Sequence, residues 1–341
     1  MKNNITLSII IPCYNAGKYI ELCLNSIYKQ DLTDKSVEII CVDDCSTDKT
    51  VEIIKKNQLV HPNLILIQQS INQKQGAARN VGLKKARGKY IWFIDADDFI
   101  AENCLSNIIK ELAENRLDIL QFNIDVTDRE GSKNVLDVNI DFETEVITGI
   151  DYLKLLMQKH WGRTVEVWRR VYNREYLIKN NLYFPEYVFG TEDLLFFYQS
   201  IVKCSRFKYI TNIFYVYRTD NQQSVTNSSE ILGIKLADKI ISNVDLIHFF
   251  KNDSLINDDL FIKAAINSYK WSLHKYIKKI FLLDKNNLHD FFKKIVIYKT
   301  TIKKELNLFE SNLITNSLLV KPINAIFVTI KNNRKILKKY K

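Results

Sequence analysis

Three aspartates, Asp95, Asp97 and Asp98, follow directly after the strand-forming residues 91–94. An acidic side chain is costly to bury unless it is paired or bound to a metal. At the carboxyl end of a strand in an open α/β sheet it can point into the ligand crevice. Carboxylates clustered there suit Mg²⁺ or Mn²⁺, which take their remaining ligands from water and a substrate phosphate. The alternative is an acidic turn in which Asp98 caps a helix over residues 100–112.

Polar and aromatic residues also follow the first two predicted strands. Pro12 lacks a backbone donor and therefore belongs where the first strand leaves the sheet. Tyr14, with its aromatic face, and Asn15 come next, while Asp43 and Asp44 follow the second strand. A carboxylate at this edge can accept a hydrogen bond from a base N–H such as a pyrimidine offers. These residues are candidates for a nucleoside site, although strand exits and helix caps have the same composition.

Two further segments have residue types that can do chemistry. Small residues from Gly76 onward open a predicted helix, whose N-terminus favours anions, and Arg79 adds a positive fork suited to phosphate. Glu192 and Asp193 follow Gly190 at the start of a later helix. Taken alone, these two acids are best explained as complements to the helix dipole. Three strand ends that present base, phosphate and metal groups to one crevice are harder to explain without a ligand.

The elements that must position these residues alternate along the first part of the chain. Strands that alternate with helices predict a parallel, doubly wound α/β sheet. The composition of residues 124–148 indicates a hairpin insertion. The predicted strands are 7–12, 37–42, 64–68, 90–94, 118–122 and 207–218, and the later helices are 149–158, 174–181, 191–202 and a Lys-rich helical region from about 229.

Composition limits the class of protein. The chain has 341 residues, of which 46% are hydrophobic and 26% charged, as in an ordinary globular protein. A chain of this length is expected to form about two domains. No apolar run approaches the roughly 18 residues of a membrane span, and the start does not resemble a signal peptide, so we expect a cytoplasmic location. The six cysteines show no paired spacing and are expected to be free core thiols.

The positive charge is concentrated at the C-terminal end. Residues 251–341 contain 19 Lys and Arg against 7 Asp and Glu, whereas residues 1–250 contain 30 against 32. Apolar residues at helical spacing over 323–330 precede the basic run 331–341. This pattern fits either a solvated helix face or peripheral binding to an anionic surface such as the inner face of the cell membrane.

Four motifs, in this order and spacing, resemble the family 2 glycosyltransferases of the GT-A fold. They are IIIPCYN at 9–15, VDDCSTD at 42–48, GAARNVG at 76–82 and IDADD at 94–98. The resemblance covers residues 5–125 strongly and 150–220 more loosely, with Cys45 at a position that is usually glycine. It implies a nucleotide-sugar donor, with UDP as the default nucleotide, a divalent metal (Mn²⁺ or Mg²⁺), and inversion at the anomeric carbon.

The resemblance also implies roles for single residues. Pro12, Tyr14 and Asp43 would surround the nucleoside, with Asn15 and Asp44 beside them, and Arg79 would lie near the donor. Within the metal signature Asp95-Ala96-Asp97, Asp97 would be the metal ligand, and Asp95 would lie near the ribose or sugar and the metal. Asp193 would be the general base, oriented by Glu192. Trp168 would line the acceptor pocket, although packing in the core is an equally good interpretation.

We therefore expect a GT-A domain over residues 1–220, with a nucleotide-sugar half (1–123) and an acceptor and catalytic half (124–220), followed by a Lys-rich helical region (221–341). The acceptor would be a hydroxyl of a glycan or lipid-linked molecule in surface polysaccharide synthesis. A sugar nucleotidyltransferase should instead have a glycine-rich loop after the first strand, which this chain lacks. A nucleic-acid-binding protein would fit the pI of 9.1. It would leave the acidic strand ends unexplained, so we expect no nucleic-acid partner.

Overall fold

The computed structural model describes residues 5–30, 36–127, 139–158, 165–188, 190–221 and 232–252, and also 283–284, 286–287, 289–291 and 293–294. The chain divides into two compact units, one of residues 1–187 with 192–222 and one of residues 188–191 with 223–341. The basic run 331–341 and the apolar spacing before it lie outside the described residues.

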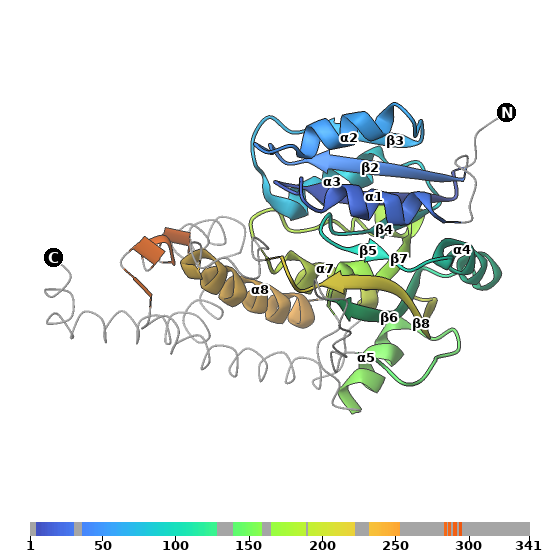
Figure 1. The fold of residues 1–341 in the computed structure, drawn as a ribbon. Helices are drawn as coiled ribbons and strands as arrows, with labels where there is room; N and C mark the ends of the chain where they lie inside the picture. Colours follow the sequence, from blue (N-terminus) through green and yellow to red (C-terminus); the bar gives the residue numbers. More distant parts are fainter. Residues whose placement is uncertain are drawn as a thin grey trace, which may run out of the picture. The chain divides into compact units, whose positions relative to one another are not determined.

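The first unit is built on one eight-stranded sheet in the order β3-β2-β1-β4-β7-β6-β8-β5 (Figure 1). The four strands from β3 to β4 are parallel to one another, β7 runs antiparallel between β4 and β6, β8 is parallel to β6, and β5 is antiparallel to β8. The strands are β1 Leu7–Cys13, β2 Val37–Asp43, β3 Leu64–Gln68, β4 Tyr90–Phe93, β5 Phe99–Ile100, β6 Ile119–Thr127, β7 Arg170–Asn173 and β8 Phe207–Arg218. The predicted α/β fold is confirmed, with a parallel half and a mixed half.

Helices cover both faces of the sheet because successive side chains of a strand point to opposite faces. In β1, Ile9 and Ile11 belong to the core that α1 and α4 cover, whereas Ile10 meets α3 on the other face. A Cβ on Gly82 would lie 2.4 Å from Cγ2 of Ile10, so only glycine lets α3 lie this close to the strand. The helices of this unit are α1 Ile20–Tyr28, α2 Thr50–Gln58, α3 Lys74–Lys85, α4 Cys104–Asn115, α5 Gly149–Gln158, η1 Val167–Arg169, α6 Arg174–Lys179 and α7 Glu192–Val202.

One sequence expectation fails in this unit. The helix predicted over 100–112 begins only at Cys104, because Phe99 and Ile100 form β5, and Asp98 is buried instead of capping a helix. Part of the hairpin predicted over 124–148 lies outside the described residues, and it stays a prediction. In the described part, β6 continues to Thr127, and Ile147 forms an isolated bridge with Phe207.

The six cysteines are thiols that form no disulfides, and all but Cys45 are buried, as predicted for core thiols. In the second unit, α8 (Leu232–Asn252) follows the predicted helical pattern, and its buried Asp238 pairs with Lys294 at 3.3 Å. In the part of the chain that the structure describes, no helix has both the length and the apolar content needed to cross a membrane.

Candidate active site

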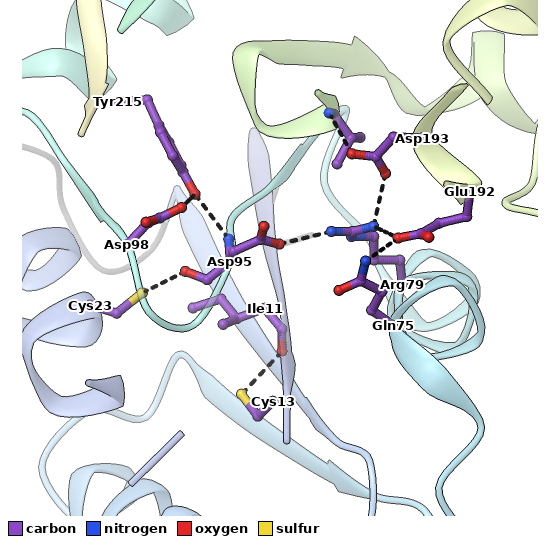
Figure 2. A network of polar contacts seen from close by, with 11 residues as sticks. Ile11, Cys13, Cys23, Gln75, Arg79, Asp95, Asp98, Glu192, Asp193 and Tyr215 are labelled. Carbon is purple, nitrogen blue, oxygen red and sulfur yellow. Dashed lines mark hydrogen bonds and ion pairs between the residues drawn. The ribbon is translucent and has the colours of Figure 1, made fainter. Parts of the chain in front are cut away.

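Arg79 of α3 joins segments that are far apart in the sequence. Its Nη2 donates to Oδ1 of Asp95 at 2.8 Å, directly after β4. Its Nη1 donates to Oε1 of Glu192 at 2.8 Å and to Oδ1 of Asp193 at 3.0 Å, both at the start of α7. Figure 2 shows the guanidinium between Asp95 on one side and Glu192 and Asp193 on the other, with Gln75 also donating to Glu192. One buried cation thus connects two of the predicted motifs.

Arg79 is enclosed by carboxylates, and its role near the donor stays a prediction. Its side chain is only 1% exposed, and both of its terminal nitrogens are bonded to carboxylates. Burial acts to lower the pKa of Arg79, but the charges of Asp193, Asp95 and Glu192 outweigh it and raise the pKa. In this arrangement Arg79 is not an open fork for a phosphate.

The face of α3 around Arg79 binds the segment that leads into α7. Asn80 exchanges two hydrogen bonds of 2.9 Å with the backbone of Phe184, and the Arg79 guanidinium lies 5.3 Å from the Phe184 ring centroid. A Cβ on Gly76 would come within 3.1 Å of the carbonyl oxygen of Pro185. Gly76, Arg79 and Asn80 lie at i, i+3 and i+4, which puts them on one face of a helix. From this spacing alone, the sequence could have predicted that one face of α3 contacts another segment of the chain.

Asp193 has the properties of an accessible base. Its Oδ2 accepts a hydrogen bond of 3.1 Å from the Val167 backbone, and 21% of its side chain remains exposed. Burial raises the pKa of Asp193 to about 7 even though Arg79 acts to lower it. A general base works best when its pKa is near the working pH. Glu192 is 1% exposed, and its Oε2 is buried without a hydrogen-bond partner, so of the two acids only Asp193 can be reached from solvent.

Asp98 has a structural environment. It is completely enclosed, accepting hydrogen bonds from the Tyr215 hydroxyl at 2.5 Å and from the Arg218 backbone at 2.8 Å. The Tyr215 hydroxyl in turn accepts the Asp95 backbone N–H at 3.2 Å (Figure 2). Burial, followed by the charge of Asp97, raises the pKa of Asp98. Asp98 therefore fixes the turn after β4 to β8 and is not placed to hold a ligand.

Asp95 and Asp97 are the residues available for a metal. Oδ2 of Asp97 accepts a hydrogen bond of 2.7 Å from Asn221, and Ala96 between the two aspartates is buried. Burial and then the charge of Asp95 raise the pKa of Asp97, and a cation bound here would act in the opposite direction. Among the described residues, no three His, Cys, Asp or Glu side chains form a metal site. Two carboxylates nevertheless fit an ion that completes its shell with water and phosphate.

Asp43 and Tyr14 have features of a nucleoside site. Asp43 lies at the carboxyl end of β2, and its Oδ2 accepts the Ser46 backbone N–H at 3.3 Å. Its Oδ1 is buried without a hydrogen-bond partner, which leaves one acceptor of this carboxylate unused. Tyr14, directly after β1, is 53% exposed, and Pro12 is half-buried near the end of that strand.

Asn15 and Asp44 are occupied by their own loops. Oδ1 of Asn15 accepts the Thr47 backbone N–H at 2.9 Å. Both oxygens of Asp44 are used, by the Gln69 side chain at 2.6 Å and by the backbone at the start of α3, at 2.7 and 2.8 Å. Burial raises the pKa of Asp44. Cys45, in the same loop, has a φ of 66°, in the region that favours the glycine usual at this position.

Trp168, the acceptor-site candidate, lies in the core. It is 7% exposed and stacks on Tyr215 and Tyr217 with ring centroids 4.6 and 5.7 Å away. Its carbonyl oxygen accepts a hydrogen bond of 2.9 Å from the Trp92 indole. This environment corresponds to the packing alternative, and a role at the acceptor stays a prediction.

The sheet, with acidic residues after β2 and β4, belongs to the GT-A class of folds, and solved structures agree. Staphylococcus aureus TarS 1-349 in complex with UDP-GlcNAc matches with a TM-score of 0.64 and 22% identity, over 86% of this chain and 81% of that chain. The mannosyltransferase PcManGT from Pyrobaculum calidifontis, in complex with GDP-Man and Mn²⁺, matches with a TM-score of 0.52 and 18% identity, over 92% of this chain and 79% of that one. At these identities the likeness concerns the fold.

The family model described as glycosyl transferase family 2 matches residues 8–180, about half of the chain, and the chain belongs to this family. It is 37% identical over 187 residues to the uncharacterized glycosyltransferase YibD of Escherichia coli, covering 54% of this chain and 53% of that protein. It is 30% identical over 227 residues to the poly(ribitol-phosphate) beta-N-acetylglucosaminyltransferase TarS of S. aureus, covering 66% of this chain and 37% of that protein. The chain thus spans about half or less of the length of these two relatives.

Proposed function

We propose that this chain is an inverting, metal-dependent glycosyltransferase that moves a sugar from a UDP-sugar to a hydroxyl group of a glycan or lipid-linked acceptor. The observation that carries the proposal is the Arg79 cluster. Asp95, on the donor side of the proposed site, and Asp193, the proposed base, bind to the two terminal nitrogens of the same guanidinium at 2.8 and 3.0 Å. This shared guanidinium supports the proposal that a donor carboxylate and an accessible base serve one reaction centre.

The donor half of the proposal rests on Asp43 and Tyr14. The unpartnered Oδ1 of Asp43 offers an acceptor to the N–H of a uracil ring, and the exposed face of Tyr14 offers a surface on which that ring can stack. The structures of S. aureus TarS in complex with UDP and with UDP-GlcNAc support UDP as the nucleotide. Pro12, Asn15, Asp44 and Ala96 would then shape the donor site through their loops.

Asp97 and Asp95 would hold a divalent cation, Mn²⁺ or Mg²⁺. When bound, such an ion stabilises the negative charge that develops on the leaving diphosphate. The complex of PcManGT with GDP-Man and Mn²⁺ supports the use of a divalent metal in this fold.

The protein's own chemical step is a proton transfer to Asp193. The acceptor hydroxyl would give its proton to the carboxylate while its oxygen bonds to C1 of the sugar. The bond from C1 to the diphosphate oxygen breaks, and UDP leaves with the electron pair. Because attack and departure occur on opposite sides of C1, the anomeric configuration inverts. The Val167 N–H and Arg79 hold the carboxylate for this transfer.

At the level of the chain, we propose that residues 1–220 form the glycosyltransferase region and 221–341 a helical C-terminal region. The TarS match and a 27% identical poly(ribitol-phosphate) beta-glucosyltransferase from Bacillus spizizenii support a role in surface polysaccharide synthesis. The basic run 331–341 lies outside the described residues, and its binding to the membrane is part of the proposal.

A donor screen tests the proposed function. The full chain is incubated with a panel of UDP-sugars and Mn²⁺, and the released UDP is measured. Without an added acceptor, UDP is released by hydrolysis of the donor. We expect release from one UDP-sugar well above the rate without protein. No release from any donor, together with no measurable UDP binding, would refute the proposal.

A further inference from the structure

Arg79 supplies the positive charge in a cluster of carboxylates around the proposed base. Glu192 of α7, Asp95 after β4 and Asp193 itself each contribute a carboxylate to the same guanidinium. On the neighbouring strand β7, the Tyr172 hydroxyl also senses the charge of Asp193. Among these described groups, one positive charge therefore faces three negative ones, and the side chain that bears it is buried.

The geometry requires a guanidinium. Arginine presents several donors in a rigid planar fork, so it can bind carboxylates in different directions at once, whereas the lysine ammonium is a compact point charge. Glu192 is 1% exposed, and a buried carboxylate is tolerated only when it is paired and hydrogen-bonded. Since all three carboxylates share the Nη1 and Nη2 atoms, their positions depend on one another.

We propose that Arg79 is a positioning residue for the base: it holds Asp193 and Asp95 in one ion cluster and favours the carboxylate form of Asp193, and it does not bind the donor phosphates. This inference rests on the proposed function, in which Asp193 is the base. It assigns Arg79 a role different from the one near the donor that the family resemblance implies.

The sign of each effect follows from the charges. Burial favours the neutral carboxyl group of Asp193, and the charge of Glu192 acts in the same direction, whereas Arg79 favours the carboxylate. Removing the positive charge should therefore strengthen proton binding by Asp193. Removing the charge of Glu192 should weaken it. A residue that only holds the fold together would not produce opposite changes at these two positions.

The proposal can be tested without knowing the acceptor. The full chain is labelled with ¹³C at the aspartate carboxyl carbons, and the Asp193 resonance is assigned by its loss in Asp193→Asn. Its titration is followed by NMR in the wild type and in Arg79→Gln, Arg79→Lys, Glu192→Gln and Asn80→Ala. Asn80→Ala is the matched control, because it loosens the same contact of α3 with residues 184–186 without removing a charge.

We expect Arg79→Gln to raise the Asp193 midpoint by about one pH unit or more, which is a tenfold or greater gain in proton affinity. Arg79→Lys should give a smaller rise, Glu192→Gln a fall, and Asn80→Ala no change beyond a few tenths of a unit. UDP affinity, measured by calorimetry, should stay within about threefold of wild type in Arg79→Lys, since the proposal places no phosphate on this side chain.

An unchanged midpoint in Arg79→Gln, or an equal rise in Asn80→Ala, would overturn the proposal, as would a tenfold loss of UDP affinity in Arg79→Lys. If Arg79→Gln does not fold, Glu192→Gln decides, because a midpoint that rises or stays constant in that variant contradicts the charge argument. A different result would refute the proposed function while leaving the role of Arg79 intact. In that case Asp193→Asn would still release UDP from the donor, while the titrations followed the predicted order.

Discussion

Two adjacent carboxylates at the start of α7 have different environments. Asp193 is 21% exposed and held by one backbone N–H and one guanidinium nitrogen, whereas Glu192 is 1% exposed beneath it. A group that must take a proton from a substrate has to be reachable, and its pKa has to lie near the working pH. The division of labour proposed for this pair, with Asp193 as base and Glu192 behind it, follows from these two properties.

The raised pKa of Asp193 makes a prediction about stability. Its value of about 7 in the folded protein exceeds the ~3.9 of an unfolded aspartate, so the folded state binds this proton more tightly. The resulting stabilisation is fully present below about pH 4 and is lost as the pH rises through 7. Because asparagine mimics the neutral carboxyl group, Asp193→Asn should be more stable than wild type at pH 8, by up to about 4 kcal/mol.

Urea unfolding at pH 8, 6 and 5 measures this difference, which should shrink as the pH falls. The exposed Asp141→Asn is the control and should show no such trend. Equal stability of Asp193→Asn and wild type at pH 8, or a difference that grows on acidification, would contradict the raised pKa.

Asp97 leads to a prediction about the metal. If the cation links this carboxylate to the diphosphate, Asp97→Asn should weaken UDP binding roughly tenfold or more in Mn²⁺ and have little effect in EDTA. Calorimetry with and without the metal checks this, with the exposed Glu102→Gln on the following connection as control. Identical UDP affinity of the wild type in both conditions would remove the metal from the account.

At the scale of elements, the turn after β4 is fastened to β8 by the Tyr215 hydroxyl. This hydroxyl donates to the buried Asp98 and accepts the backbone N–H of Asp95. Tyr215→Phe leaves a buried carboxylate without this donor, which costs about 1–3 kcal/mol. We therefore expect a lower urea midpoint and weaker Mn²⁺-dependent UDP binding, because the turn carries both proposed metal ligands.

Tyr217→Phe is the matched control for Tyr215→Phe. Tyr217 lies on the same strand and also stacks on Trp168, but it makes neither of the two contacts of the Tyr215 hydroxyl. A similar loss in both variants would assign the effect to aromatic packing, and the hydroxyl would then have no special role.

Local sequence patterns explain the strands of this sheet but not the long-range contacts of its polar residues. Strands such as β3 and β8 were predictable to the residue, because an apolar run between turn residues is a local signal. The motifs that end β1, β2 and β4 were also found, because parallel strands place their carboxyl ends at one edge. Local pattern could not reveal that Asp98 is bound by Tyr215, 117 residues away, or that Arg79 binds Glu192, 113 residues away. Such long-range pairs decide which polar residues face a ligand and which are enclosed.

At the scale of the whole molecule, the charge is divided between two regions. Residues 1–250 are nearly balanced, with 30 Lys and Arg against 32 Asp and Glu, and the excess of 19 against 7 lies in residues 251–341. A basic residue near an anionic leaflet contributes about 1 kcal/mol, so a few simultaneous contacts suffice for recruitment. Because screening limits the attraction to about 8 Å at physiological salt, binding should weaken as ionic strength rises.

Sedimentation with liposomes tests this prediction. The full chain should bind vesicles in proportion to their anionic lipid content, and a version that ends at Asn316 should bind less. Equal binding by both proteins, or binding that is indifferent to anionic lipid and salt, would leave the basic run as a solvated surface.

We propose above that the carboxylates after β4 and at the start of α7 form one site for glycosyl transfer. The most direct measurement is the rate of UDP release from the best UDP-sugar in Mn²⁺ by the wild type and by Asp193→Asn, with UDP affinity measured in parallel. Loss of a general base predicts a rate lower by about 10²–10⁴-fold with UDP affinity near wild type. UDP release at the wild-type rate by a folded Asp193→Asn would contradict the account.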